Sequence, residues 1–102
     1  MEKERERCTD NGGNQFNEQI KKMVWSTGIK IPNYPVDVWR IDYTGMVIRY
    51  DKFGDSEDFY GWEIDHIDPV SNGGGDDIDN LQPLNCKRNI EKGDEVDWVF
   101  PE

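Results

Sequence analysis

The chain has 102 residues, of which 34% are hydrophobic and 12% aromatic, so we expect one small domain with a modest core. It has no run of about 18 apolar residues, and its charged start, residues 1–7, has no apolar stretch behind it. We therefore expect neither a membrane span nor a signal peptide, and a cytoplasmic protein. The cysteines Cys8 and Cys86 form no Cys-x-x-Cys pair, so neither a structural zinc nor a disulfide framework is expected.

The formal net charge of −10 is unusual for a protein that grips nucleic acid, because such a surface normally carries an excess of Lys and Arg. The charge is also uneven. Residues 1–36 carry six basic and five acidic side chains, whereas residues 63–102 carry three basic and eleven acidic ones. We therefore expect the chain alone to bind DNA weakly and in a salt-sensitive way.

The first part of the chain predicts an arm followed by a helix. Residues 1–7 alternate acid and base without an apolar face, and residues 11–14 carry a turn signal, so we expect a flexible arm over residues 1–13. Asn14 is a candidate cap for a helix over residues 15–26. The apolar stripe that packs this helix on the core is Phe16, Ile20, Met23 and Val24.

A β-hairpin is predicted next. Residues 38–43 and 46–50 are β-prone runs on either side of Thr44-Gly45, a plausible tight turn. Arg40 on this hairpin either faces a phosphate or pairs with a carboxylate such as Asp42, and we slightly favour the pairing.

Residues 60–94 predict a strand, a second strand and a helix. Residues 60–67 alternate, with Trp62 and Ile64 on one face, until Pro69 stops the strand. Residues 81–84 supply a short second strand. Residues 86–92 supply a helix, with Cys86 and Ile90 as its buried edge and Gly93 as its stop.

This last region carries the residues that phosphodiester hydrolysis requires. The reaction needs a base for water, a cation near the phosphate and a frame that holds both. His66, the only histidine, is the candidate base. Asp65 and Asn89 offer oxygen ligands of the kind that Mg²⁺ accepts, provided that the last helix projects Asn89 toward the strand.

Three short motifs occur in order: Asp-His-Ile-x-Pro from Asp65, Asn-Leu-Gln-Pro-Leu from Asn80, and Asn-x-x-Lys-Gly-Asp from Asn89. This combination resembles the HNH endonucleases, the ββα-metal or His-Me finger group. It is similar to the HNH domain of RNA-guided CRISPR effectors and to small stand-alone bacterial and phage HNH proteins. Gly93 stands where colicin-type DNases have a further histidine, which points to a magnesium-type site.

The resemblance implies an α+β fold in which the N-terminal helix and the β-hairpin pack on a ββα-metal motif. Residues 14–102 would form one HNH nuclease domain with its core at residues 60–94. His66 would be the general base and Asn80 its positioning residue, while Asp65 and Asn89 would hold Mg²⁺ or Mn²⁺ without a structural zinc. The candidate substrate-binding residues are Lys92, Arg88, Lys87 and Arg40.

Two of these assignments have a structural alternative. Lys92 either contacts phosphate or answers the backbone carbonyls at the end of its helix. Asn85 is either an auxiliary ligand or the N-cap of that helix, and the cap is the better interpretation.

We expect an enzyme that nicks DNA, with RNA left open as a substrate and a protein partner that supplies affinity for DNA. One alternative is a catalytically weak or inactive binding module that keeps the frame and presents an acidic, DNA-mimicking or protein-docking surface. Another is a toxin-like or defence effector whose acidity reflects a missing carrier.

Overall fold

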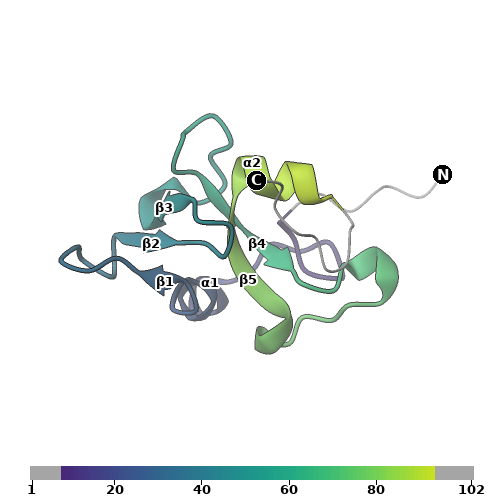
Figure 1. Ribbon diagram of the computed structural model, residues 1–102. Helices are drawn as coiled ribbons and strands as arrows, with labels where there is room; N and C mark the ends of the chain where they lie inside the picture. Colours follow the sequence, from purple (N-terminus) through teal and green to yellow (C-terminus); the bar gives the residue numbers. More distant parts are fainter. Residues whose placement is uncertain (1–7, 94–102) are drawn as a thin grey trace.

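A computed structural model of the protein describes residues 8–93 (Figure 1). Residues 1–7 of the predicted arm, and Asp94 of the third motif, lie outside the described residues. The structure is α+β, as predicted. Its helices and strands are α1 (Glu18–Trp25), β1 (Ile29–Lys30), β2 (Trp39–Ile41), β3 (Val47–Arg49), β4 (Trp62–His66), β5 (Leu81–Asn85) and α2 (Cys86–Lys92), with short 3-10 turns at Tyr50–Lys52, Val70–Asn72 and Ile78–Asn80.

Helix α1 begins later than the sequence predicts because Asn17, and not Asn14, is its N-cap. The Asn17 side chain accepts a hydrogen bond from the backbone N–H of Ile20 at 2.8 Å, which satisfies one of the unpaired donors of the first turn. Asn14 lies instead in a turn built around Asp10, whose carboxylate accepts from the Asn14 N–H at 2.8 Å. The helix buries Val24 and Trp25.

The predicted hairpin is present as β2 and β3, and β1 adds a short third strand to it. Asp42 shapes the connecting turn, since its Oδ1 accepts from the backbone N–H groups of Thr44 at 2.9 Å and Met46 at 3.0 Å. The other carboxylate oxygen accepts from the N–H of Asn85 at 2.9 Å. Asp42 therefore ties this sheet to the junction between β5 and α2.

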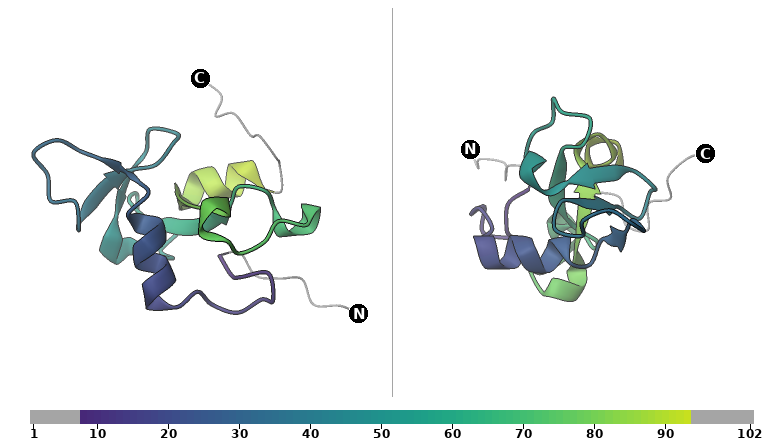
Figure 2. Two further views of the ribbon diagram at one scale, coloured as in Figure 1. Left: turned by 90° about the horizontal axis from the view of Figure 1, so that it is seen from below. Right: turned by 90° about the vertical axis from the view of Figure 1, so that its left-hand side faces the viewer.

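The second sheet is the β4–β5 hairpin, in which Trp62 pairs with Asn85 and His66 pairs with Leu81. All five residues of β4 are buried. The strand lies between two helices, with α1 on one side and α2 on the other (Figure 2). Side chains two positions apart along β4 therefore face the same helix.

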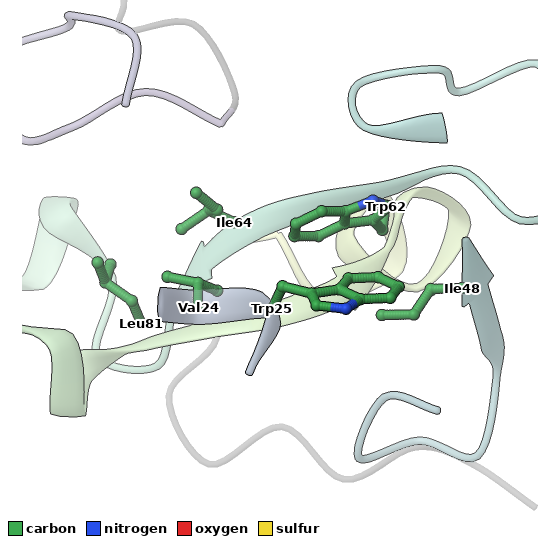
Figure 3. Close-up of a cluster of buried hydrophobic side chains, with 6 residues drawn as sticks. All are labelled: Val24, Trp25, Ile48, Trp62, Ile64 and Leu81. Atoms are coloured by element: carbon green, nitrogen blue, oxygen red, sulfur yellow. The ribbon is translucent and has the colours of Figure 1, made fainter. Parts of the chain in front are cut away.

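The hydrophobic core lies on the α1 side of this hairpin (Figure 3). The rings of Trp25 and Trp62 contact each other in a tilted arrangement with centroids 5.0 Å apart, and Trp62 is wholly buried. Aromatic pairs of this kind contribute beyond the area that they bury. The cluster consists of Val24, Trp25, Ile48, Trp62, Ile64 and Leu81.

The α2 side of the hairpin is polar instead. Asn85 is the N-cap of α2, as predicted, and its side chain accepts from the Lys87 N–H at 3.0 Å. The helix buries Cys86, Asn89 and Lys92, whereas Ile90 is 55% exposed. The prediction of Ile90 as a buried edge was wrong, because the buried face of α2 follows every third residue from Cys86. Within residues 8–93 we find no helix with the length and apolarity that a membrane crossing requires.

Candidate active site

Asp65 projects from β4 toward α2, and its side chain is almost fully buried, with 6% of the residue exposed. Its Oδ2 accepts a hydrogen bond from Nε2 of Gln82 at 2.9 Å, and its Oδ1 lies 3.3 Å from Nζ of Lys92. Burial raises the pKa of the Asp65 carboxyl above its usual value, even though the Gln82 hydrogen bond and the Lys92 charge act in the opposite direction. The fold therefore holds this carboxylate at an electrostatic cost.

Lys92 points inward from the last turn of α2 and is only 3% exposed. Besides the contact with Asp65, its Nζ donates to the backbone carbonyl of His66 at 3.1 Å. A buried ammonium is costly unless it is paired and hydrogen-bonded, and these two oxygens supply both. Lys92 thus binds β4 instead of the carbonyls at the end of its own helix, and its contact with a phosphate stays a prediction.

Asn89 projects toward the same face of β4, one turn before Lys92. Its Nδ2 lies 3.3 Å from Oε1 of Glu63, and both residues are buried. Glu63 and Asp65 are two positions apart on one face of β4, which corresponds to a separation of about 7 Å along the strand. The structure thus brings Asn89 to the strand that carries Asp65, with its amide directed at Glu63. The three sequence motifs assign Glu63 no role, although alternation along a strand places it on the same face as Asp65.

His66 projects from the other face of β4. Its Nε2 lies 2.8 Å from Oδ1 of Asp76, and its ring centroid lies 5.9 Å from that of Phe16. The imidazole is covered by these two residues, with 4% of the side chain exposed. Asp76, which is 32% exposed, also accepts from the backbone N–H of Asn11. The part of the predicted arm that the structure describes therefore lies against the loop beside His66.

Asn80 closes the loop between β4 and β5. Its Oδ1 accepts from the N–H of Asp68 at 2.8 Å, and its Nδ2 donates to the carbonyls of Asp68 at 3.2 Å and of Gly75 at 2.8 Å. The backbone N–H of Ile67 donates to the Asn80 carbonyl at 2.8 Å. These bonds fix the chain on both sides of the loop, directly after His66 and directly before Asp76.

The remaining basic candidates lie outside this cluster. Arg40 is 6% exposed and donates to the carbonyls of Val36, Ser26 and Gly28, so its guanidinium braces the end of α1 and not a substrate. Arg88 binds the carboxylate of Glu91 on the outer face of α2.

Lys87 lies near the start of the same helix, with its ammonium 5.7 Å from the centroid of the Phe59 ring. It is exposed on the outer side of α2. Lys87 is thus the candidate substrate-binding residue whose side chain is open to solvent.

The donor chemistry of the α2-facing layer fits a hard divalent cation. Asp65, Glu63 and the Asn89 amide are oxygen donors, and the Lys92 ammonium shows that positive charge is favoured beside Asp65. Over the described residues 8–93, no three His, Cys, Asp or Glu side chains converge as a metal cluster. The site has at most two carboxylates and an amide to offer.

A buried β-hairpin followed by a helix, with a carboxylate and a histidine at consecutive positions of the first strand, has the layout of a ββα finger. Residues 51–95 match the family model described as HNH endonuclease, so this segment is similar to that family. No curated protein and no solved structure matches the chain. The family is one of nucleases that act on nucleic acids and generally use a divalent metal.

Proposed function

We propose that the protein is a metal-dependent endonuclease that hydrolyses phosphodiester bonds of DNA and cuts one strand at each encounter. The observation that carries the proposal is the buried polar layer between β4 and α2. Asp65, Asn89 and Lys92 are each at most 6% exposed, although apolar residues would pack there at lower cost. In a segment that matches the HNH endonuclease model, buried polar side chains that lower the stability of the fold support a catalytic role.

Asp65 and Asn89 are the residues that would hold Mg²⁺ or Mn²⁺, with Glu63 beside them. When bound, such an ion neutralises charge on the phosphate and on the leaving oxygen. Lys92 must leave the Asp65 carboxylate for a second cation to bind there. Once released, its ammonium would be close enough to the site to meet a phosphate oxygen, which is the role that the sequence suggested.

His66 supplies the base. An ionised Asp76 can only accept a hydrogen bond, so Nε2 of a neutral His66 carries the proton and Nδ1 carries the lone pair. Nδ1 accepts one proton from water, the water oxygen bonds to phosphorus, and the bond from phosphorus to the leaving oxygen breaks. The leaving oxygen then takes a proton from solvent. Asn80 positions the base by holding the chain on both sides of it.

Access to this base requires a movement. Phe16 and Asp76 cover the imidazole, so a water and a phosphate reach His66 only when the segment before α1 shifts. The net charge of −10 also makes DNA binding unfavourable over most of the surface. We therefore propose that a basic protein partner contributes affinity for DNA, with the exposed Lys87 and the neighbouring Arg88 as this chain's own contacts.

The closed site also supports a second candidate function. In it the protein is a binding module that has the ββα fold but no catalytic activity. In favour of it, Lys92 already neutralises Asp65, the Asn89 amide is directed at Glu63, and His66 is covered. An acidic surface of this kind would dock on a basic protein and not on DNA.

A supercoiled-plasmid assay separates the two functions. The tag-free protein is incubated with Mg²⁺, with Mn²⁺ or with EDTA, and we expect open-circular product only with a metal. His66→Ala should lower the rate by about 10²–10⁴-fold, the usual contribution of a general base. Ser71→Ala, an exposed change on the same loop, is the matched control. Intact plasmid with every metal, together with tight binding of a basic protein, would establish the binding module.

A further inference from the structure

We propose that Asp76 is the positioning residue of the His66 base, and that it completes a link running from Asn80 through the loop to the imidazole. The inference rests on the proposed nuclease function. Nothing in the three motifs points to Asp76, which the sequence presents as one of several acidic residues in a glycine-rich turn.

The hydrogen bond between Asp76 and His66 is well placed to orient the imidazole. The 2.8 Å distance lies at the short end of the usual range for a hydrogen bond between nitrogen and oxygen, and the imidazole side chain is 4% exposed. An ionised carboxylate offers no proton, so the bond selects one of the two neutral forms of the ring. Without it, the proton distributes between the two nitrogens, and part of the population has its lone pair on the wrong one.

The carboxylate is itself held from two sides. The backbone N–H of Asn11 donates to both of its oxygens, at 3.1 and 3.2 Å. On the chain side, Asn80 binds the carbonyl of Gly75, the residue directly before Asp76, at 2.8 Å. The hydrogen bonds of the Asn80 side chain go to backbone atoms of Asp68 and Gly75, so its influence on the base passes through this loop. Asp76 is the side chain that transmits it.

Two side chains contact the His66 ring in the interactions of the described residues, Asp76 by a hydrogen bond and Phe16 by its ring. Phe16 covers one face of the ring without charge, and Lys92 contacts the His66 carbonyl and not its imidazole. Asp76 is the carboxylate that hydrogen-bonds to the ring, and its removal takes this hydrogen bond away.

Because the chain contains one histidine, the ring can be followed without ambiguity. Nitrogen-15 NMR of the tag-free, metal-free protein at about pH 8, where an ordinary imidazole is neutral, reports which ring nitrogen carries the proton. We expect a protonated Nε2 in the wild type, a mixture in Asp76→Ala, and restoration of the wild-type signal in Asp76→Glu. Asp77→Ala removes a neighbouring exposed carboxylate that makes no side-chain cap bond and should leave the signal unchanged.

Plasmid nicking by the same variants completes the test. Asp76→Ala should lower kcat about tenfold to a hundredfold, less than loss of the base itself, with KM nearly unchanged and with partial recovery in Asp76→Glu. A wild type that nicks, with Asp76→Ala equal to it in kcat or in its nitrogen signals, overturns the positioning role alone. A wild type that leaves the plasmid intact with Mg²⁺ and with Mn²⁺ overturns the nuclease function and the positioning role with it.

Discussion

The ammonium of Lys92 lies 3.3 Å from Oδ1 of Asp65, and the two side chains are 3% and 7% exposed. A buried ion pair of this kind contributes little net stability, yet the loss of one partner leaves an uncompensated charge in the interior. The pair therefore has two consequences. It protects the fold while no divalent cation is bound, and it competes with such a cation for the same carboxylate.

Lys92→Met should destabilise the metal-free protein by about 3–5 kcal/mol, because Asp65 is then buried without its cation. Mn²⁺ should restore more stability to this variant than to the wild type, since the competing ammonium is gone. Urea unfolding in EDTA and in Mn²⁺ measures both effects. The double variant Asp65→Asn with Lys92→Met should regain most of the loss, because it removes both charges.

The exposed Lys87→Met is the matched control for this change and should stay within about 0.5 kcal/mol of the wild type. Equal stabilisation of Lys92→Met and the wild type by Mn²⁺ would argue against competition at Asp65.

Gly74→Ala and Gly75→Ala should behave oppositely although they are neighbours. A Cβ at Gly74 would lie 1.7 Å from the carbonyl oxygen of Asp68, so the loop must move, at a cost of about 1–3 kcal/mol. A Cβ at Gly75 meets nothing within 4 Å. We expect Gly74→Ala to displace Asp76 and lose most nicking activity, and Gly75→Ala to retain it. Thermal unfolding and the plasmid assay test the pair, and full activity in a stably folded Gly74→Ala would show that the loop path is unimportant.

The sequence was sufficient for the elements that local signals define. The cap at Asn85 and the stop at Gly93 bound α2, and the Thr44-Gly45 turn located the first hairpin. The short β1 was missed because two residues carry no periodicity. Asn17 displaced Asn14 as the cap of α1, because the turn around Asp10 uses Asn14.

The site was less predictable, because its contacts depend on how separate elements meet. The phase of α2 relative to β4 decides that Lys92 points inward and Ile90 outward, and a helix with a single aliphatic residue does not reveal that phase. The contact of His66 with Asp76 depends on the path of a ten-residue excursion between them. No spacing rule encodes such a path, although a carboxylate directly after a glycine run could have been considered as a partner.

Arg40→Met should destabilise the fold without changing how DNA binding depends on salt. The substitution leaves the carbonyls of Ser26 and Gly28 without the Arg40 donor, while the Val36 carbonyl keeps the Trp25 indole, and the loss should cost at least about 2 kcal/mol. Lys87→Gln should instead keep the stability and reduce the slope of log affinity against log salt by about 1, as expected for one phosphate contact. Fluorescence anisotropy with labelled DNA at several salt concentrations, in Ca²⁺ to suppress cleavage, measures the slopes. A reduced slope in well-folded Arg40→Met would return Arg40 to the substrate surface.

Tyr50 should lose its proton at a higher pH than an ordinary tyrosine, and its replacement should change the stability of the fold at both low and high pH. Desolvation, and then its hydrogen bond to Glu18, raises the pKa of the Tyr50 phenol to about 12. The folded state then holds this proton above the usual pKa of 10.0, so stability falls as pH rises from about 10 to 12.

The same bond is the main cause that lowers the pKa of Glu18, so its contribution is present above the unfolded pKa and is lost as pH falls through the folded value. Tyr50→Phe should flatten both slopes and remove the latest phase of phenolate absorbance, whereas the exposed Tyr34→Phe should leave both unchanged. If the phase of phenolate absorbance at the highest pH survives in Tyr50→Phe, another tyrosine causes it. The hydrogen bond between Tyr50 and Glu18 is then not the origin of this phase.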